Sequence, residues 1–285
     1  MARNRTVARV FSEKPEVVTS FIDNPEAIRI LRLALDLIAK HGDTMAQKVS
    51  PPKSRLTEYH LEVSARAGRR VLGDGRPTQP GTFSPGTDDA LVAISQLYQE
   101  AAVAQTQLTA LATEIAATPG CEGTPQARKS LKSQDRIMEK LDADYNGDPL
   151  QVLDIAGAKI QYDNLDTLYW ALDLIIQRPD VKIVRFKDRF AKPFGSGYQD
   201  ILMNLRMSNG HIAEFRLHLK AMDEVANIEH ATYEFKRSTD AMAKAEGRQI
   251  TDAEQALLNA LDARTRPVFD QALSKAGAAE AGAGD

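Results

Sequence analysis

The sequence is poor in the features that mark several protein classes. Its 285 residues include one cysteine, Cys121, so no disulfide can form within the chain and we expect a reducing, cytoplasmic location. There is no run of 18 apolar residues, and no apolar stretch follows the basic start, so we expect neither a membrane span nor a secretion signal. A Gly-X-Y period is missing, and 43% hydrophobic residues are too many for a wholly disordered chain. These absences leave a globular protein with a sizeable core.

The charge of the chain is unevenly distributed. The formal net charge is −3, yet residues 1–80 carry 14 Lys/Arg against 9 Asp/Glu. A basic N-terminal third favours an anionic partner, although a solvated basic helix face has the same composition.

Helix signals and turn residues divide the chain into four parts. Asn24-Pro25 is a typical helix start, and a Gly/Pro-rich stretch over 73–87 is typical of a linker. Thr251-Asp-Ala-Glu254 is a capping box that predicts a final helix. We therefore expect a helical region with its linker over 1–85, a layered domain over 86–240, a C-terminal helix over 241–275 and a disordered tail over 276–285.

The hydrophobic period changes from helical to strand-like within the layered domain. Apolar residues predict strands over 152–160, 181–186, 198–207 and 211–219, with an amphipathic helix over 165–177. Ser208-Asn-Gly210 predicts a tight hairpin between the last two strands. The expected fold class is α/β (α+β), with a mixed, partly antiparallel sheet of four or five strands, flanking helices and an N-terminal helical appendage.

Four basic residues recur at a spacing of four. Thr124-Pro125 predicts the start of a helix to Leu141, on which these residues would form one stripe. Like charges at this spacing repel unless an anion such as a triphosphate neutralises them. The alternative is a solvated face, in which acidic residues of the same helix pair with the stripe. The stripe consists of Arg128, Lys132, Arg136 and Lys140.

Two acidic residues are candidates for metal chemistry. Asp154 lies in an otherwise apolar strand segment, and Glu214 lies on the polar face of the strand over 211–219. Together they could hold Mg²⁺, which needs one or two carboxylates and leaves other positions for phosphate oxygens and water. The alternatives are a strand-end cap for Asp154 and an ordinary exposed strand face for Glu214. The motifs of P-loop, dinucleotide-fold and zinc-hydrolase proteins are absent.

Five blocks of the sequence follow one another in a fixed order: residues 132–141, 154–160, 192–199, 214–217 and 230–236. Together they resemble the synthetase domain of the RelA/SpoT superfamily, the alarmone synthetases. The metal-binding HD motif of the family's hydrolase domain is missing, so the chain resembles a divergent, stand-alone synthetase module. The resemblance implies a nucleotidyltransferase-like fold that transfers pyrophosphate from ATP to a ribose 3′-hydroxyl with Mg²⁺.

The resemblance also implies a role for each matching residue. Asp154 and Glu214 would bind Mg²⁺ and serve catalysis, with Glu214 alternatively activating the attacking hydroxyl. The ATP side would consist of Arg128, Lys132, Arg136, Lys140 and Lys159. The acceptor side would consist of Lys192, Tyr198, Arg216 and His230, although packing is an equal alternative for His230.

Departures from the family pattern cluster on the acceptor side. Arg216 stands where the family usually has Gln, Asp200 replaces Ser, and Leu202 replaces His. The expected partners are therefore ATP and an acceptor that is either a nucleotide or a tRNA, with no membrane. Self-association and a protein partner for the N-terminal region remain open. The alternatives to an alarmone-type enzyme are a non-catalytic binding module and a growth-inhibiting toxin with the same chemistry.

Overall fold

The computed structural model describes residues 4–42 and 55–281, which form two compact units. Each unit collects segments that are distant in the sequence, so the predicted linear divisions near residues 85 and 240 do not coincide with the limits of the units. The sheet unit comprises Arg55–Ala191, Asp200–Lys220 and residues 279–281, and the helical unit comprises residues 4–42, Lys192–Gln199 and Ala221–Ala278.

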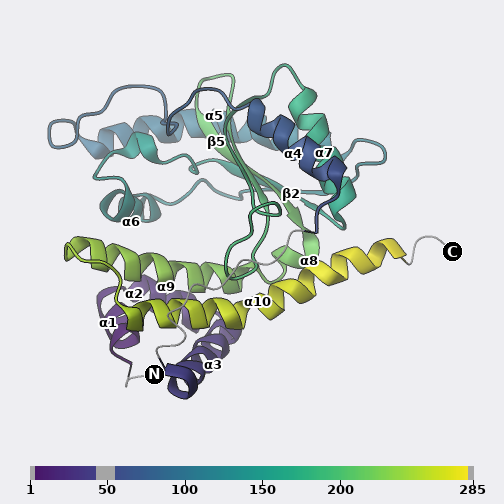
Figure 1. Cartoon of the computed structure of the whole chain (residues 1–285). Coiled ribbons are helices and arrows are strands. Elements are labelled where there is room, and N and C mark those ends of the chain that lie inside the picture. Colours follow the sequence, from purple (N-terminus) through teal and green to yellow (C-terminus); the bar gives the residue numbers. More distant parts are fainter. Residues whose placement is uncertain (1–3, 43–54, 282–285) are drawn as a thin grey trace. The chain divides into compact units, whose positions relative to one another are not determined.

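The sheet unit contains a mixed sheet with the strand order β1-β2-β5-β4-β3 in the part of the chain that the structure describes (Figure 1). Strands β2 and β5 are parallel, and the other three pairs are antiparallel. This confirms the predicted fold class, a partly antiparallel sheet of four or five strands flanked by helices. The strands are β1 (Thr124–Ala127), β2 (Gly157–Tyr162), β3 (Lys182–Asp188), β4 (Ile201–Arg206) and β5 (Ile212–Leu219).

Alternation along β5 separates the two faces of the sheet. Ala213, Phe215 and Leu217 are fully buried, whereas Glu214 and Arg216 are half-buried on the opposite face. The predicted hairpin between β4 and β5 is present, and Gly210 adopts a φ of +89°, which an L side chain rarely tolerates. One face of the sheet is therefore core and the other carries ionisable groups.

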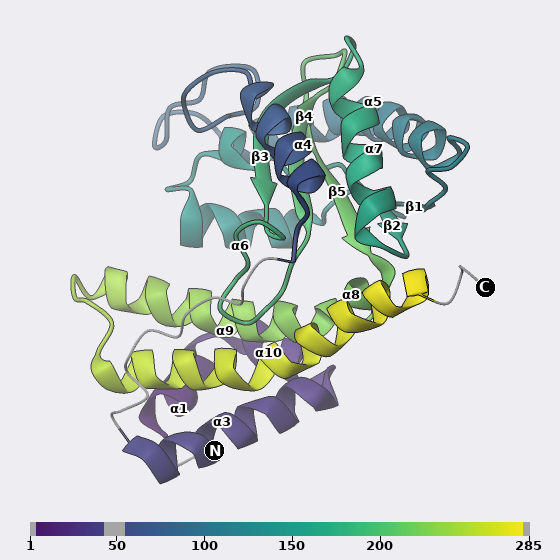
Figure 2. The ribbon, with the colours of Figure 1, turned by 45° about the vertical axis from the view of Figure 1, so that its right-hand side comes forward.

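Helices pack against the apolar face of this sheet. Helix α5 contacts β1, β2 and β5, while α7 contacts β2 and β5. Figure 2 shows α4 and α7 side by side, and α4 also contacts β3. The helices of the sheet unit are α4 (Glu58–Arg69), α5 (Ala90–Ala116), α6 (Gln134–Asp144), the 3₁₀ helix η2 (Pro149–Gln151) and α7 (Leu165–Gln177).

The segment that begins at Thr124 differs from the prediction. Thr124–Ala127 forms β1, an edge strand paired with β2, and the helix α6 starts ten residues later at Gln134. An edge strand tolerates Pro125 because the missing N–H costs no hydrogen bond there. Ser133 is the actual N-cap, since its side chain accepts the N–H of Arg136.

The helical unit is built around one apolar cluster. Phe21, Ile30, Phe235 and Leu257 belong to this cluster, and α9 runs alongside α10 in both views (Figures 1 and 2). Its helices are α1 (Arg5–Glu13), α2 (Pro15–Ile22), α3 (Pro25–His41), α8 (Lys220–Asp223, shared with the sheet unit), α9 (Ala226–Ala245) and α10 (Asp252–Ala281).

Helix caps in this unit follow the local sequence. The Asn24 side chain accepts the N–H of Ala27 and starts α3, as predicted. Thr251 and Glu254 form the reciprocal bonds of a capping box, so α10 also starts as predicted. It extends to Ala281, beyond the predicted end, and the rest of the predicted tail lies outside the described residues. Among the helices described, none has the length and apolar composition that a membrane crossing requires.

Candidate active site

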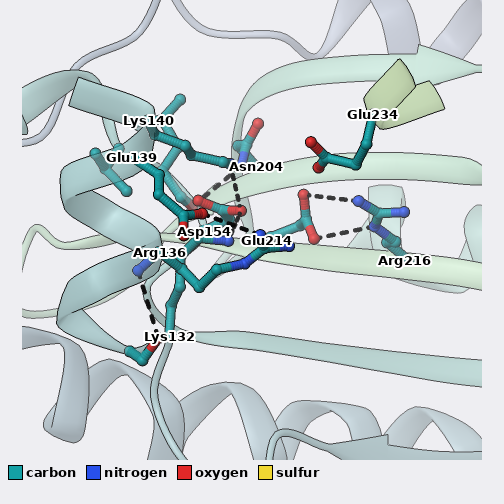
Figure 3. A network of polar contacts seen from close by, with 12 residues as sticks. Lys132, Arg136, Glu139, Lys140, Asp154, Asn204, Glu214, Arg216 and Glu234 are labelled. Carbon is teal, nitrogen blue, oxygen red and sulfur yellow. Dashed lines mark hydrogen bonds and ion pairs between the residues drawn. The ribbon is translucent and has the colours of Figure 1, made fainter. Parts of the chain in front are cut away.

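Asp154 lies in the connection between η2 and β2, where two lysines contact the same oxygen. Lys140 Nζ lies 2.7 Å and Lys132 Nζ 3.0 Å from Asp154 Oδ2. Lys132 precedes the N-cap of α6 and Lys140 lies on that helix, so the start of α6 brings both ammonium groups to one carboxylate (Figure 3). The three side chains are 14–23% exposed, which makes the cluster a partly buried one.

The cluster perturbs the pKa values of its members. Burial favours a neutral Asp154, but the two ammonium groups outweigh it and hold the pKa of Asp154 well below its usual range. Burial, Lys140 and Arg128 lower the pKa of Lys132 despite Asp154. Burial lowers the pKa of Lys140, but Asp154, Tyr145 and Glu214 together raise it above its usual value. The two lysines differ because Lys140 and Arg128 oppose the charge of Lys132, whereas Tyr145 and Glu214 favour the charge of Lys140.

Asp154 has one oxygen that the lysines do not use. Among the described residues, Oδ1 of Asp154 is buried without a hydrogen-bond partner. A buried carboxylate oxygen without a hydrogen-bond partner is a suitable ligand for a hard cation, because hard cations prefer oxygen ligands. Within the described ranges, no three His, Cys, Asp or Glu side chains are grouped so that they could hold a metal ion by themselves. The residues therefore fit a cation that takes one or two carboxylates and completes its shell with phosphate and water, as Mg²⁺ does.

Glu214 lies on β5, opposite Gly157 of β2 and Asn204 of β4 in the register of the sheet. Figure 3 shows Glu214 and Asp154 within one polar network, and both carboxylates act on the charge of Lys140. The structure thus gathers the two predicted acidic residues. Arg216 contacts both carboxylate oxygens of Glu214, with Nε at 3.0 Å and Nη2 at 3.1 Å.

Behind Arg216 lies a buried acidic residue to which the sequence assigned no role. Asp200 is fully buried and pairs with Arg189, with Arg216 Nη1 at 3.3 Å and with His218 Nε2 at 3.5 Å. Burial raises the pKa of Asp200, but His218 and the two arginines hold it well below its usual range. Asp200 lies directly before β4. In the sequence it was noted only as a departure from the family pattern.

Arg128 follows β1 and lies over Gly157. A Cβ at Gly157 would lie 2.6 Å from Arg128 Nε, so only glycine leaves room for this side chain. The amide of Gln105 on α5 holds both backbone groups of Gly157, with its Oε1 accepting the N–H and its Nε2 donating to the carbonyl oxygen. Gln105 is a second residue that pattern analysis missed, because its partner is 52 residues away.

The predicted stripe of four basic residues on one helix is therefore wrong. Arg128 and Lys132 precede α6, and only Arg136 and Lys140 lie on it. The predicted pairing within the helix is present in part, since Arg136 contacts Glu139 at 3.0 Å. Lys159 lies on β2 beside Arg216 in the register. Lys132 and Lys140 meet at Asp154 through the tertiary fold rather than through the helical period.

Three predicted acceptor residues, Lys192, Tyr198 and His230, belong to the helical unit, whereas Arg216 belongs to the sheet unit. Tyr198 is only 6% exposed and packs between Phe194 and Phe269. Its role as a stacking surface for an acceptor base stays a prediction that this burial does not favour.

Comparison with known proteins places part of the chain in a family. Residues 129–239 match the family described as a region found in RelA / SpoT proteins. This segment contains Lys132, Lys140, Asp154 and Glu214. No curated protein matches the chain.

Several solved structures are similar to it. A chain in the complex between the Type VI effector Tas1 and its immunity protein is 20% identical, with a TM-score of 0.47. Small alarmone synthetases 1 and 2 of Bacillus subtilis are 20% and 21% identical, with TM-scores of 0.40 and 0.43. Each alignment covers 68% of this chain and 100% of the other. Since these TM-scores lie below 0.5, the assignment rests on residues 129–239. Residues 129–239 are therefore similar to a region found in RelA / SpoT proteins, which agrees with the resemblance that the motifs of the sequence carry.

Proposed function

We propose that the chain transfers pyrophosphate from ATP to the ribose 3′-hydroxyl of a nucleotide or of a tRNA, with Mg²⁺. The observation that supports this most is the environment of Asp154. Its Oδ2 forms ion pairs with two ammonium groups, while its Oδ1 has no hydrogen-bond partner among the described residues. A site for a polyphosphate–metal complex needs cationic side chains that neutralise the phosphate oxygens and carboxylates that bind the metal ion.

The cationic residues bind and orient ATP. Lys132, Lys140 and Arg128 neutralise its phosphate oxygens, and Arg136 and Lys159 are the further cations that the family resemblance assigns to ATP. In the absence of ATP, Asp154 serves as the counter-ion that keeps the two lysines together. Bound at Asp154 and Glu214, Mg²⁺ would neutralise charge on the transferred group.

The reaction forms a bond between the acceptor 3′-oxygen and the β-phosphorus of ATP. The bond between that phosphorus and the oxygen bridging it to the α-phosphate breaks, and AMP leaves. The proton of the hydroxyl passes to Glu214, directly or through water. For this role Glu214 must exchange its contact with Arg216 for the acceptor, and Asp200 offers Arg216 a second anchor.

The test is transfer of label from γ-labelled ATP with Mg²⁺ to each acceptor in turn, with AMP release measured alongside. The acceptors are GDP, GTP, ADP, ATP and tRNA. We expect label transfer to at least one acceptor, and at least a hundredfold lower rate for Glu214→Gln, which keeps the shape but removes the charge. Glu62→Gln, an exposed carboxylate on α4, is the matched control. No label transfer to any acceptor, or equal rates for the two variants, would contradict the proposal.

A module that binds nucleotide without turnover is the second candidate. It is favoured by one observation, the occupation of both Glu214 oxygens by Arg216. Calorimetric titration with ATP and Mg²⁺ separates the two functions, because binding without AMP release supports the module. If the protein is a toxin with the same chemistry, we expect its expression to arrest cell growth and Asp154→Ala to relieve the arrest.

A further inference from the structure

Three residues that the proposed function uses are anchored through their backbones to one short segment of the sheet unit. The chain directly after Asp154 presents three successive carbonyl oxygens, those of Ile155, Ala156 and Gly157. Each of them accepts a main-chain N–H from a distant part of the sequence, at 3.0–3.1 Å. The donors, in the same order, are Lys132, Glu214 and Arg128. The positions of these three residues therefore depend on where this carbonyl row lies.

The last residue of the carbonyl row is held by a side chain of α5. Gln105 Oε1 accepts the N–H of Gly157 at 2.9 Å, and Gln105 Nε2 donates to the carbonyl oxygen of Gly157 at 3.1 Å. Nε2 also lies 3.2 Å from Thr109 Oγ1, so both of its N–H groups have an acceptor in this orientation of the amide. Because the amide binds both the donor and the acceptor of Gly157, it restricts the position and the orientation of that backbone.

Gly157 is the residue of the row at which such support matters most. Strand β2 begins there, and the side chain of Arg128 takes the space that a Cβ would fill. Glycine loses more conformational freedom on folding than any other residue, so its backbone needs further contacts to stay in place. The two hydrogen bonds from Gln105 supply them.

A second side chain of α5 acts on the other end of the row. The hydroxyl of Tyr98 donates to the carbonyl oxygen of Lys132, the residue whose N–H binds Ile155. Tyr98 and Gln105 are about two helical turns apart, so they lie on one face of α5. Both precede residues 129–239, so this support comes from outside the segment that matches the family.

We propose that Gln105 is a positioning residue for the pyrophosphate transfer, and that α5 holds the active site in place through Gln105 and Tyr98. By fixing Gly157, Gln105 fixes the carbonyl row, and with it the positions of Lys132 and Glu214 relative to Asp154. This inference rests on the proposed function. Phosphoryl transfer depends mainly on the alignment of charged groups, so a small displacement of these side chains lowers the rate.

The first test is amide hydrogen exchange of the full chain, followed by NMR, which needs no substrate. Gln105→Met keeps the length of the side chain and removes both hydrogen bonds to Gly157. We expect exchange in this variant to be at least about tenfold faster at the amides of Gly157, Lys132 and Glu214.

Gln107→Met is the matched control for a general loosening of α5. Gln107 lies on the same helix and makes a similar pair of bonds to Ser208, accepting its N–H at 3.1 Å and donating to its hydroxyl at 2.7 Å. We expect this variant to leave exchange at Lys132 and Glu214 unchanged. If the two variants exchange equally fast at these two amides, the anchoring by Gln105 is overturned.

The second test is the rate of label transfer from ATP at saturating substrate. We expect kcat of Gln105→Met to be at least about tenfold below that of Gln107→Met, and Tyr98→Phe to lower kcat about threefold. A purely structural role would lower the urea midpoints of both α5 glutamine variants and leave kcat of the folded protein unchanged, which would reject the positioning role. If the exchange pattern is as expected but the wild-type chain transfers no label, the anchoring stands and the proposed reaction is rejected.

Discussion

The ammonium group of Lys140 lies 2.7 Å from Oδ2 of Asp154, the oxygen that also accepts from Lys132 at 3.0 Å. Two cations that would repel one another are therefore held on one acidic side chain. Asp154 therefore keeps both lysines in position before ATP binds. The phosphate oxygens of ATP can then accept hydrogen bonds from the same two ammonium groups.

This arrangement makes Asp154 important for stability as well as for chemistry. Asp154→Asn would leave two partly buried ammonium groups without their counter-ion, so we expect the free energy of unfolding to fall by about 2–3 kcal/mol. Urea unfolding at neutral pH measures this change. The exposed Glu62→Gln should stay within about 0.5 kcal/mol of the wild type. Equal midpoints for the two variants would show that the lysines do not depend on Asp154.

Gly157→Ala tests the position of Arg128. Because a Cβ there would lie 2.6 Å from Arg128 Nε, the guanidinium must move, and we expect the affinity for ATP with Mg²⁺ to fall about fivefold. Stability should change by less than about 1 kcal/mol, since the long side chain can swing away. Gly68→Ala on α4 meets no atom within 4 Å and serves as the control. Unchanged ATP affinity in Gly157→Ala would remove Arg128 from the ATP site.

Arg216→Gln tests whether Arg216 competes with a metal ion for Glu214. The variant removes a cation that contacts both carboxylate oxygens, so we expect the affinity for Mg²⁺ to rise about fivefold in the presence of a non-hydrolysable ATP analogue. Calorimetric titration with MgCl₂ gives the affinity. Arg206→Gln removes an exposed cation from the end of β4 and should have no effect. A weaker affinity in Arg216→Gln would instead assign Arg216 to substrate binding.

Stability should depend on pH through His211. Burial lowers the pKa of His211 to about 4, although Glu100 Oε2 lies 3.7 Å from its Nδ1. Below pH of about 6.5 the unfolded chain takes up a proton that the folded chain refuses until about pH 4. The free energy of unfolding is therefore expected to fall by about 2–3 kcal/mol as the pH drops through this window and to be insensitive above it.

His211→Gln should remove that component. The difference in unfolding free energy between the wild type and this variant, followed from pH 7 to pH 4, isolates the residue from the acidic groups. Asp154 does not interfere, because its depressed pKa contributes equally to the wild type and to the variant and therefore cancels in the difference. A difference that stays constant over the window would mean that His211 takes up its proton at the same pH in the folded and the unfolded chain.

Much of the local structure followed from short patterns. Asn24 before Pro25 starts α3, Thr251 with Glu254 starts α10, and a turn at Gly210 joins β4 to β5. In each case the deciding groups lie within four residues of one another, so the sequence contains the whole interaction. Asp154 and Glu214 were identified in a different way. Each is an acidic residue in a predicted strand segment, and each lies in a block that resembles the same family.

Thr124-Pro125 shows where local patterns mislead. The pair fits a helix start, but pairing with β2 makes it an edge strand, and a partner 35 residues away decides between the two. The roles of Gln105 and Asp200 were missed for the same reason, because their contacts cross between elements.

The sequence by itself determined the helix caps, the alternation of β5, the fold class and the similarity of residues 129–239 to a known family. These features depend on neighbours along the chain or on motifs in a fixed order. Only the tertiary structure decided that Lys132 and Lys140 meet at Asp154, that Arg216 contacts both oxygens of Glu214 and that Tyr198 is buried. Charge pairing and burial depend on distances through space, and those are set by packing between elements that the chain order leaves apart.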